Sequence, residues 1–252
     1  MTTPGPRTWS LRLSLRRRKL ALQIGPASAS MTAEYSQPPG TPQDVLNFPV
    51  SPGALTAVEI RDLLGYEDPV ILDVGANSGQ TTVELLTVMP EATIFAFEPD
   101  PRAIAKFRRN IRHPRVHLQE CAVGAVIGTI TFHQSSGAED LPDYQAGWDQ
   151  SGSIRRPRSH LQVWPWVKFH TQIEVPIVTL DSWAEAQGVD EVDFIWADVQ
   201  GAESDLVDGA SRILRTARFF YTEYSNHEWY EGQVTLPALA AKLPDFELIR
   251  RY

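Results

Sequence analysis

The chain has 252 residues, of which 42% are hydrophobic, enough to bury the core of one ordinary domain. Its net charge of −8 is uneven: residues 1–30 hold six bases and no acid, which leaves 17 bases against 31 acids, a net −14, for the rest. A body this acidic is a poor partner for a phosphate backbone, so no nucleic acid is expected to bind.

The N-terminal region differs in composition from the remainder. Residues 1–30 are basic, and residues 36–53 are rich in Pro and Gly, so residues 1–53 are interpreted as a basic tail and a linker before a domain at 54–252. No apolar stretch is long enough to span a membrane. Cys121 is the only cysteine, which excludes a disulfide within the chain and fits a reducing, cytoplasmic location.

Strand and helix patterns alternate from residue 56 onward. In chain order we predict a helix at 56–64, a strand from Val70, a helix at 78–88, a strand at 93–97, a helix at 101–111 and a strand at 115–120. An extra strand or hairpin arm follows at 127–133. The polar stretch 134–158 has no period and is interpreted as a long loop, of the kind that forms functional lids or is disordered.

The second half continues this alternation. Residues 172–177 predict an exposed strand, and Pro176 favours a sheet edge. The remaining predicted elements are a helix at 180–187, a strand at 192–198, a helix at 202–214, a strand at 218–223, a helix at 235–242 and a strand at 246–252. This order predicts an α/β fold with a doubly wound, mostly parallel sheet.

The first motif is the run Val70-Ile-Leu-Asp-Val-Gly-Ala-Asn-Ser-Gly-Gln80, a buried strand that ends in an acid and opens into a glycine turn. Such a loop holds a nucleotide-like cofactor, with Gly75 and Gly79 allowing close approach. A dinucleotide fingerprint would have glycine at positions 77 and 80. A carboxylate at Asp73 would repel a pyrophosphate and suits a cationic cofactor, S-adenosylmethionine.

Acids also follow other strands. Glu98 stands 25 residues after Asp73, where a carboxylate can accept both hydroxyls of a ribose. Because the carboxyl ends of parallel strands share one sheet edge, several acids should converge there, and a cationic ligand or a metal would offset their repulsion. No metal ligands are assigned, since His and Cys show no ligand spacing, but a divalent cation bound by oxygen remains possible. The converging acids are Asp73, Glu98, Glu120, Asp198 and Glu223.

The second motif is Asp198-Val-Gln-Gly-Ala-Glu203. Gly201 allows a sharp turn from strand to helix, and Glu203 falls in the first helical turn, where it is either a helix cap or a functional group. The strand that ends at Asp198 is expected to lie beside the strand that starts at Val70, which would place the Asp198 carboxylate near a reactive methyl group.

These two motifs together resemble the FkbM family of S-adenosylmethionine-dependent methyltransferases. The segments Phe97-Glu-Pro99, Val178-Thr-Leu-Asp181 and Thr222-Glu-Tyr224 extend the resemblance over roughly residues 68–250. It implies a class I, Rossmann-like methyltransferase fold and O-methylation of a hydroxyl on a small-molecule acceptor, a sugar or a natural product. Two departures stand out: Trp196 replaces a common Lys, and the chain ends at Tyr252, where such folds usually add an antiparallel strand.

The two motifs and the family resemblance predict a role for each candidate residue. Asp198 is expected to position or deprotonate the acceptor hydroxyl, with Glu223 second and His227 a further candidate base. Trp229 is assigned to the core, and Tyr230 to the core or a stacking wall. Alternatives are a nicotinamide-dependent oxidoreductase or a non-catalytic cofactor-binding module; the oligomeric state is not predicted. The residues expected to bind the cofactor are Asp73, Gly75, Asn77, Gly79, Glu98, Pro99, Glu120, Cys121 and Asp198.

Overall fold

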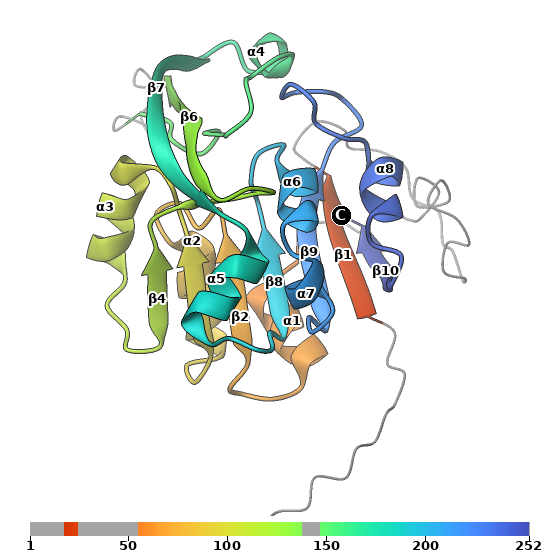
Figure 1. Cartoon of the computed structure of the whole chain (residues 1–252). Coiled ribbons are helices and arrows are strands. Elements are labelled where there is room, and N and C mark those ends of the chain that lie inside the picture. Colours follow the sequence, from red (N-terminus) through yellow and green to blue (C-terminus); the bar gives the residue numbers. More distant parts are fainter. Residues whose placement is uncertain (1–17, 25–54, 138–146, 252) are drawn as a thin grey trace, which may run out of the picture.

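The computed structural model describes residues 18–24, 55–137 and 147–251. Its centre is a seven-stranded sheet in the order β10-β1-β9-β8-β2-β3-β4, with every neighbouring pair parallel (Figure 1). The predicted parallel, doubly wound sheet is confirmed. Its strands are β1 (Arg18–Ile24), β2 (Val70–Val74), β3 (Thr93–Phe97), β4 (Val116–Gln119), β8 (Phe194–Ala197), β9 (Phe219–Tyr224) and β10 (Phe246–Arg251).

Helices cover both faces of the sheet. Successive residues of β2 point to opposite faces, and accordingly Ile71 and Leu72 belong to different hydrophobic clusters. One cluster packs the sheet against α1 and α2, and the other packs it against α5, α6, α7 and α8. No helix in the described ranges has the length and apolar character needed to cross a bilayer. The helices are α1 (Ala57–Leu64), α2 (Gln80–Val88), α3 (Pro101–Asn110), α4 (His160–Val163), α5 (Leu180–Gln187), α6 (Glu203–Asp208), α7 (Ser211–Leu214) and α8 (Leu236–Ala241).

Strand β1 was not predicted. It lies between β9 and β10 and pairs in parallel with both (Figure 1). The interpretation of residues 1–53 as tail and linker is therefore wrong for Arg18–Ile24, while residues 1–17 and 25–53 lie outside the described residues. Composition misled the prediction because a central strand is held by backbone hydrogen bonds, which basic side chains do not prevent. The sheet thus reaches seven strands with an N-terminal parallel strand.

A second, three-stranded sheet lies above the carboxyl ends of the large one (Figure 1). It has the order β5-β7-β6, formed by β5 (Ala122–Val123), β6 (Gly128–Gly137) and β7 (Val167–Val178). The prediction that Pro176 marks an edge strand is wrong, since β7 lies between two partners. Pro176 is tolerated because β5 pairs only with Ile177 and Val178.

The predicted helix 202–214 is interrupted. It divides into α6 and α7 around Gly209, whose backbone lies so close to the chain at Gly124 that a Cβ atom would stand 2.0 Å from the Gly124 carbonyl oxygen. This contact connects the α6–α7 turn to the small sheet.

Candidate active site

Two neighbouring cavities open at the carboxyl edge of the large sheet. The first cavity has a volume of about 300 Å³ and the second about 280 Å³. Three residues line both: Gln150, Asp198 and Gln200. The first is otherwise lined by the ends of β2, β3 and β8, Cys121–Val123 and residues 149–154; the second is lined by loops between residues 148 and 167, by 198–203 and by 223–233.

The glycine turn after β2 serves the packing of the chain. Gly75 has a φ of +88°, and a Cβ there would lie 1.8 Å from the carbonyl oxygen of Asp198. Gly79 has a φ of +90°, and its Cβ would lie 2.3 Å from the Ile111 side chain. Gly75 and Asn77 line the first cavity, whereas Gly79 lies outside the lining. The glycines therefore bring the β2 and β8 loops together and seat α2 against α3.

Asp73 lies beneath the first cavity. Its carboxylate is fully buried; Oδ2 accepts a hydrogen bond from Thr82 Oγ1 at 2.5 Å, and Oδ1 has no hydrogen-bond partner. The pKa of Asp73 is raised to about 6, mainly by burial and in smaller part by the nearby charge of Asp198. Asp73 is not among the residues that line the cavity, so it supports the loop from behind.

Glu98 faces the first cavity and is held by the main chain. One oxygen accepts the backbone N–H of Asn77 at 2.9 Å, and the other accepts that of Asp100 at 2.7 Å. Asn77 has a left-handed φ of +46° in this turn. Burial raises the pKa of Glu98 to about 8. Each carboxylate oxygen keeps acceptor capacity for a ligand hydroxyl.

Of three other residues predicted to bind the cofactor, two line the first cavity and one does not. Pro99 and Cys121 line the first cavity, and burial raises the pKa of the Cys121 thiol to about 11, so the thiol remains protonated. Glu120 does not join them: its exposed carboxylate forms an ion pair with Arg108 of α3 and lies outside the lining. Trp196, the departure from the family motif, lines the first cavity and stacks on Tyr221 with ring centroids 3.9 Å apart.

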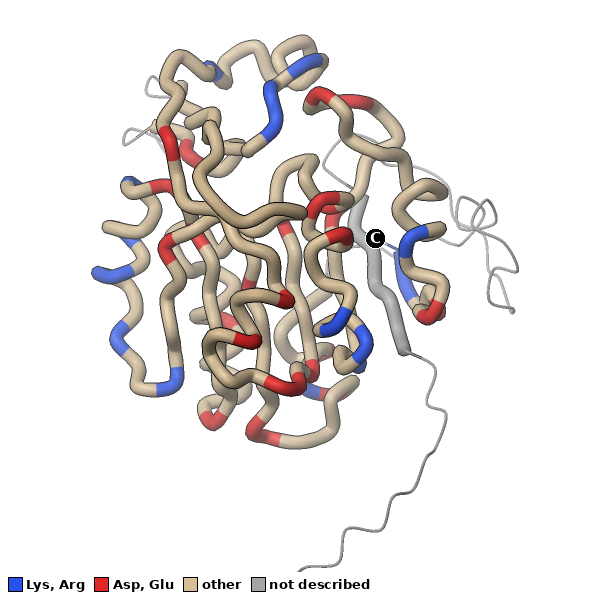
Figure 2. Tube along the Cα trace, in the orientation of Figure 1, with Lys and Arg blue, Asp and Glu red and all other residues tan. Residues whose placement is uncertain are grey.

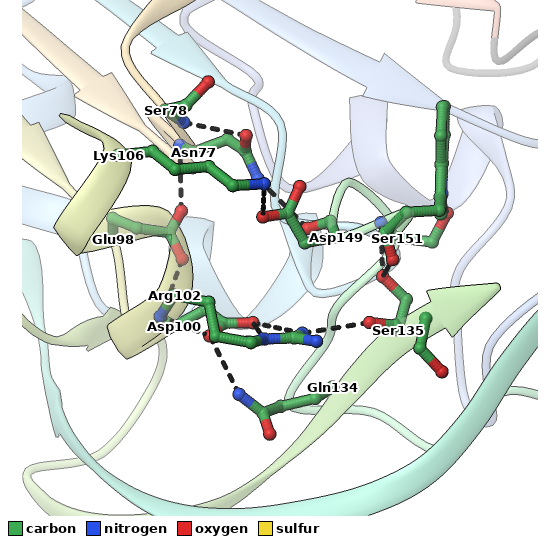
Figure 3. Close-up of polar contacts among 12 residues, drawn as sticks. Asn77, Ser78, Glu98, Asp100, Arg102, Lys106, Gln134, Ser135, Asp149 and Ser151 are labelled. Atoms are coloured by element: carbon green, nitrogen blue, oxygen red, sulfur yellow. Dashed lines mark hydrogen bonds and ion pairs between the residues drawn. The ribbon is translucent and has the colours of Figure 1, made fainter. Parts of the chain in front are cut away.

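Residues 149–154 close one side of the first cavity. Figure 3 shows how α3 and the β2 turn reach this segment: Lys106 Nζ lies 2.6 Å from Asp149 Oδ2, and Asn77 Nδ2 donates to the Asp149 carbonyl at 3.0 Å. Lys and Arg recur along α3 (Figure 2), and Lys106 is the one that holds Asp149. The predicted long loop thus contributes a wall of the cavity; residues 138–146 lie outside the described part.

A buried polar cluster connects α3 to β6. Asp100 accepts hydrogen bonds from Arg102 Nη2 at 2.6 Å and Gln134 Nε2 at 2.8 Å (Figure 3). Arg102 also donates to the Ser135 carbonyl at 2.9 Å, and the Ser135 hydroxyl accepts the backbone N–H of Ser151 at 3.1 Å. These bonds fix the position of the 149–154 wall relative to the sheet.

The second cavity has aromatic walls. Two tryptophan pairs meet edge to face: Trp148 with Trp166 at 5.2 Å and Trp164 with Trp229 at 4.9 Å between ring centroids. Tyr230 also lines the cavity. Trp229 is 9% exposed, as its predicted place in the core requires, and it also lines the cavity.

Three carboxylates lie among these aromatic rings: Asp198, Glu203 and Glu223. Burial raises the pKa of Glu203 to about 7, and burial followed by the charge of Asp198 raises that of Glu223 well above its ordinary value. Glu203 accepts the Gly201 N–H at 3.0 Å, a bond to the turn that precedes α6. Within the described ranges, no three or more His, Cys, Asp or Glu side chains are arranged to hold a metal ion.

The histidines differ from the prediction. His227 is exposed and lies outside both cavity linings. His160 lines the second cavity instead; it is 4% exposed and its Nδ1 has no hydrogen-bond partner. Burial lowers the pKa of His160 to about 4, so the ring is neutral at physiological pH. No sequence pattern points to His160, because it follows an aperiodic loop.

Comparisons with known proteins found the following similarities. The family model of the methyltransferase FkbM domain matches residues 73–252. The chain is 45% identical over 195 residues to 2-O-methyltransferase NoeI of Sinorhizobium fredii, covering 77% of this chain and 79% of that protein. It is 27% identical over 154 residues to Methyltransferase 1 of Beauveria bassiana, covering 57% and 59%. The crystal structure of methyltransferase FkbM from Methylobacillus flagellatus aligns over 58% of this chain and 30% of its own, with 15% identity and a TM-score of 0.38.

Proposed function

This chain belongs to the FkbM family of methyltransferases, and from that premise we propose that its first cavity binds S-adenosylmethionine and its second binds the acceptor hydroxyl. The observation that carries the proposal is the wall shared by the two cavities, formed by Asp198, Gln200 and Gln150. Methyl transfer requires donor and acceptor in line and in contact. A shared wall at the end of β8 is where two bound molecules could meet.

The residues of the first cavity fit the proposed donor. Glu98 is fixed by two backbone N–H groups with its remaining acceptor sites available for ribose hydroxyls. Asp73 lies outside the lining, but its buried carboxylate adds to the cluster of acids at this sheet edge, which favours a cationic ligand. When bound, S-adenosylmethionine supplies an electrophilic methyl group on a cationic sulfur. Cys121 and Pro99 provide the adjoining wall.

Asp198 is the proposed base. It lines both cavities, so it can accept the proton of an acceptor hydroxyl at the boundary between them. Burial raises the pKa of Asp198, which makes its ionised form a stronger base. Glu223 lines only the second cavity and is the alternative base.

The proposed acceptor is a sugar hydroxyl. The tryptophan rings supply apolar faces for a sugar ring, and Glu223 and Glu203 supply acceptors for its other hydroxyls. The relative from Sinorhizobium fredii is a 2-O-methyltransferase, which supports the hydroxyl at position 2 of a ring as the site of methylation.

The test measures methyl transfer from radiolabelled S-adenosylmethionine to a panel of sugars and to their 2-deoxy analogues. Label should enter the sugars and not the analogues. Label in a 2-deoxy analogue would refute the position, and absence of turnover with calorimetric binding of the donor would favour the non-catalytic module. Addition of EDTA tests the divalent cation: unchanged turnover would exclude a dissociable metal.

A further inference from the structure

A chain of hydrogen bonds runs from the proposed base into the wall of the second cavity. Gln200 Nε2 donates to Asp198 Oδ1 at 2.6 Å. The hydroxyl of Tyr230 lies 3.0 Å from Gln200 Oε1 and 2.8 Å from the Ser151 carbonyl oxygen. Tyr230 is 1% exposed, whereas Gln200 and Asp198 are half-buried and line both cavities.

This arrangement contains one donor too few. The Tyr230 hydroxyl has a single proton, yet it faces two oxygens that only accept, Gln200 Oε1 and the Ser151 carbonyl. Gln200 adopts this orientation because an ionised Asp198 can only accept a hydrogen bond, and so requires the N–H side of the amide. With Asp198 ionised, the two oxygens share the proton of Tyr230.

Protonation of Asp198 would reverse the two hydrogen bonds that the Gln200 amide makes. If the Gln200 amide rotates by half a turn, Asp198 O–H donates to Gln200 Oε1, Gln200 N–H donates to the Tyr230 oxygen, and Tyr230 O–H donates fully to the Ser151 carbonyl. Each donor then has one acceptor. No covalent bond among Gln200, Tyr230 and Ser151 forms or breaks in this change. The one proton that enters is the proton that Asp198 takes from the acceptor hydroxyl.

Resting on the proposed function of Asp198, we propose that Gln200 is a positioning residue whose amide rotates with each turnover to hold Asp198 in its ionised form before methyl transfer and in its protonated form afterwards. Tyr230 is the partner that makes both orientations possible.

The backbone around Gln200 confines the motion to the side chain. Its φ is +52°, and its carbonyl accepts the Ser153 hydroxyl at 2.7 Å. The following Gly201 lies under the Tyr230 ring, since a Cβ there would stand 2.8 Å from the ring carbons. The main chain and the tyrosine ring are therefore fixed, and the terminal amide is the part free to turn.

The acidic groups around Asp198 disfavour its ionised form, so the hydrogen bond from Gln200 Nε2 is important for keeping Asp198 ionised. Glu223 on β9, Glu203 on α6 and Asp73 on β2 all interact with Asp198 as like charges, and Tyr230 faces it from its loop. Burial raises the pKa of Asp198, and the Gln200 hydrogen bonds lower it. A carboxylate base works only when ionised, so loss of the Gln200 N–H would move the acid limb of the kcat profile to higher pH.

The test records kcat against pH for Gln200→Met, which keeps the length of the side chain and removes the amide. We expect kcat near neutral pH to fall roughly 10- to 100-fold, the fold-change of one charge-assisted hydrogen bond, and to recover as pH rises. Gln200→Glu, which adds a like charge, should shift the limb in the same direction. Gln233→Met removes another amide of the second cavity that does not contact Asp198, and should leave the limb in place.

A second measurement covers Tyr230. In the Gln200→Met background, Tyr230→Phe should change kcat far less than it does in the wild-type chain, because the relay is already broken. Calorimetric titration of S-adenosylmethionine shows that each variant is folded. A loss of kcat that is equal at every pH, or additive effects of the two substitutions, would overturn the proposal. If Asp198→Asn retains full turnover the base assignment fails; if it is inactive while Gln200→Met keeps the wild-type profile, only this inference fails.

Discussion

The two cavities are neighbours, yet they are built in different ways. The first rests on the ends of β2, β3 and β8, and its principal carboxylate, Glu98, is fixed by two main-chain N–H groups. The second is lined mostly by loop residues, including the tryptophan pairs, together with the side chains of Glu203 on α6 and Glu223 on β9.

This difference separates general from specific recognition. Main-chain groups at strand ends keep their place when side chains change, whereas a wall of loop side chains can be altered one residue at a time. Substitutions in the first cavity should therefore change binding of the methyl donor, and those in the second should change use of the acceptor. Substitutions at the shared wall, above all at Asp198, should change the chemistry without greatly changing either.

The largest effect is expected at the shared wall. Asp198→Asn removes the proposed base while keeping the shape of the side chain, so kcat should fall about 10²- to 10⁴-fold, the usual contribution of general base catalysis. Affinity for S-adenosylmethionine should stay within a few fold. Steady-state kinetics and calorimetry measure the two quantities; full turnover in Asp198→Asn with none in Glu223→Gln would exchange the two roles.

Next comes the first cavity. Glu98→Ala should weaken S-adenosylmethionine binding by roughly 1–3 kcal/mol, the cost of leaving buried hydrogen-bonding groups without a partner, and acceptor KM should change little. Calorimetric titration gives the donor affinity directly. Wild-type affinity in this variant would show that the nucleoside does not bind at Glu98.

The third prediction concerns pH and the second cavity. The pKa of Glu203 is raised from 4.5 to about 7, mainly by burial, so its contribution to stability is complete below pH 4.5 and is lost as pH rises through 7. Glu203→Gln should therefore raise the free energy of unfolding at pH 8 by on the order of 2 kcal/mol and have little effect near pH 4.5. Denaturant unfolding at the two pH values tests this; equal effects at both would contradict the assignment.

Removal of β1 should affect the two cavities unequally. A chain starting at Met31 lacks the strand that pairs with β9 and β10, so β9, which carries Glu223, loses a neighbour. The melting temperature should fall by several degrees, the scale set by 1–2 kcal/mol in a domain of this size. Acceptor KM should rise more than the dissociation constant of the donor. An unchanged melting temperature would support a dispensable tail.

The smallest effect is expected at the aromatic wall. Trp164→Ala removes the edge-to-face partner of Trp229 and should raise acceptor KM up to about tenfold, the scale of 0.5–1.5 kcal/mol for an aromatic pair. Donor affinity should not change. Equal losses in donor and acceptor binding would show that the two cavities are not independent.

Sequence patterns could locate the acids at the strand ends but not the walls that residues 148–167 add to both cavities. Asp73, Glu98 and Asp198 end predicted strands of a parallel sheet, and topology brings such positions to one edge. Lys106 and Asp149 are 43 residues apart, and His160 and Trp164 follow an aperiodic loop, so no local period reveals that they converge. Glu120 ends a strand too, but turns outward to Arg108. Strand β1 was not predicted because backbone hydrogen bonds hold it in the sheet, and these bonds do not depend on the basic side chains that determine its composition.

The most direct test of the account is a crystal structure with S-adenosylhomocysteine and an acceptor sugar bound together. We predict that the ribose lies at Glu98, that the sugar packs against the tryptophan pairs, and that the acceptor oxygen lies beside Asp198, roughly 3–3.5 Å from the position of the transferred methyl carbon. A nucleoside in the tryptophan-lined cavity, or a sugar hydroxyl that does not reach the shared wall at Asp198, would contradict it.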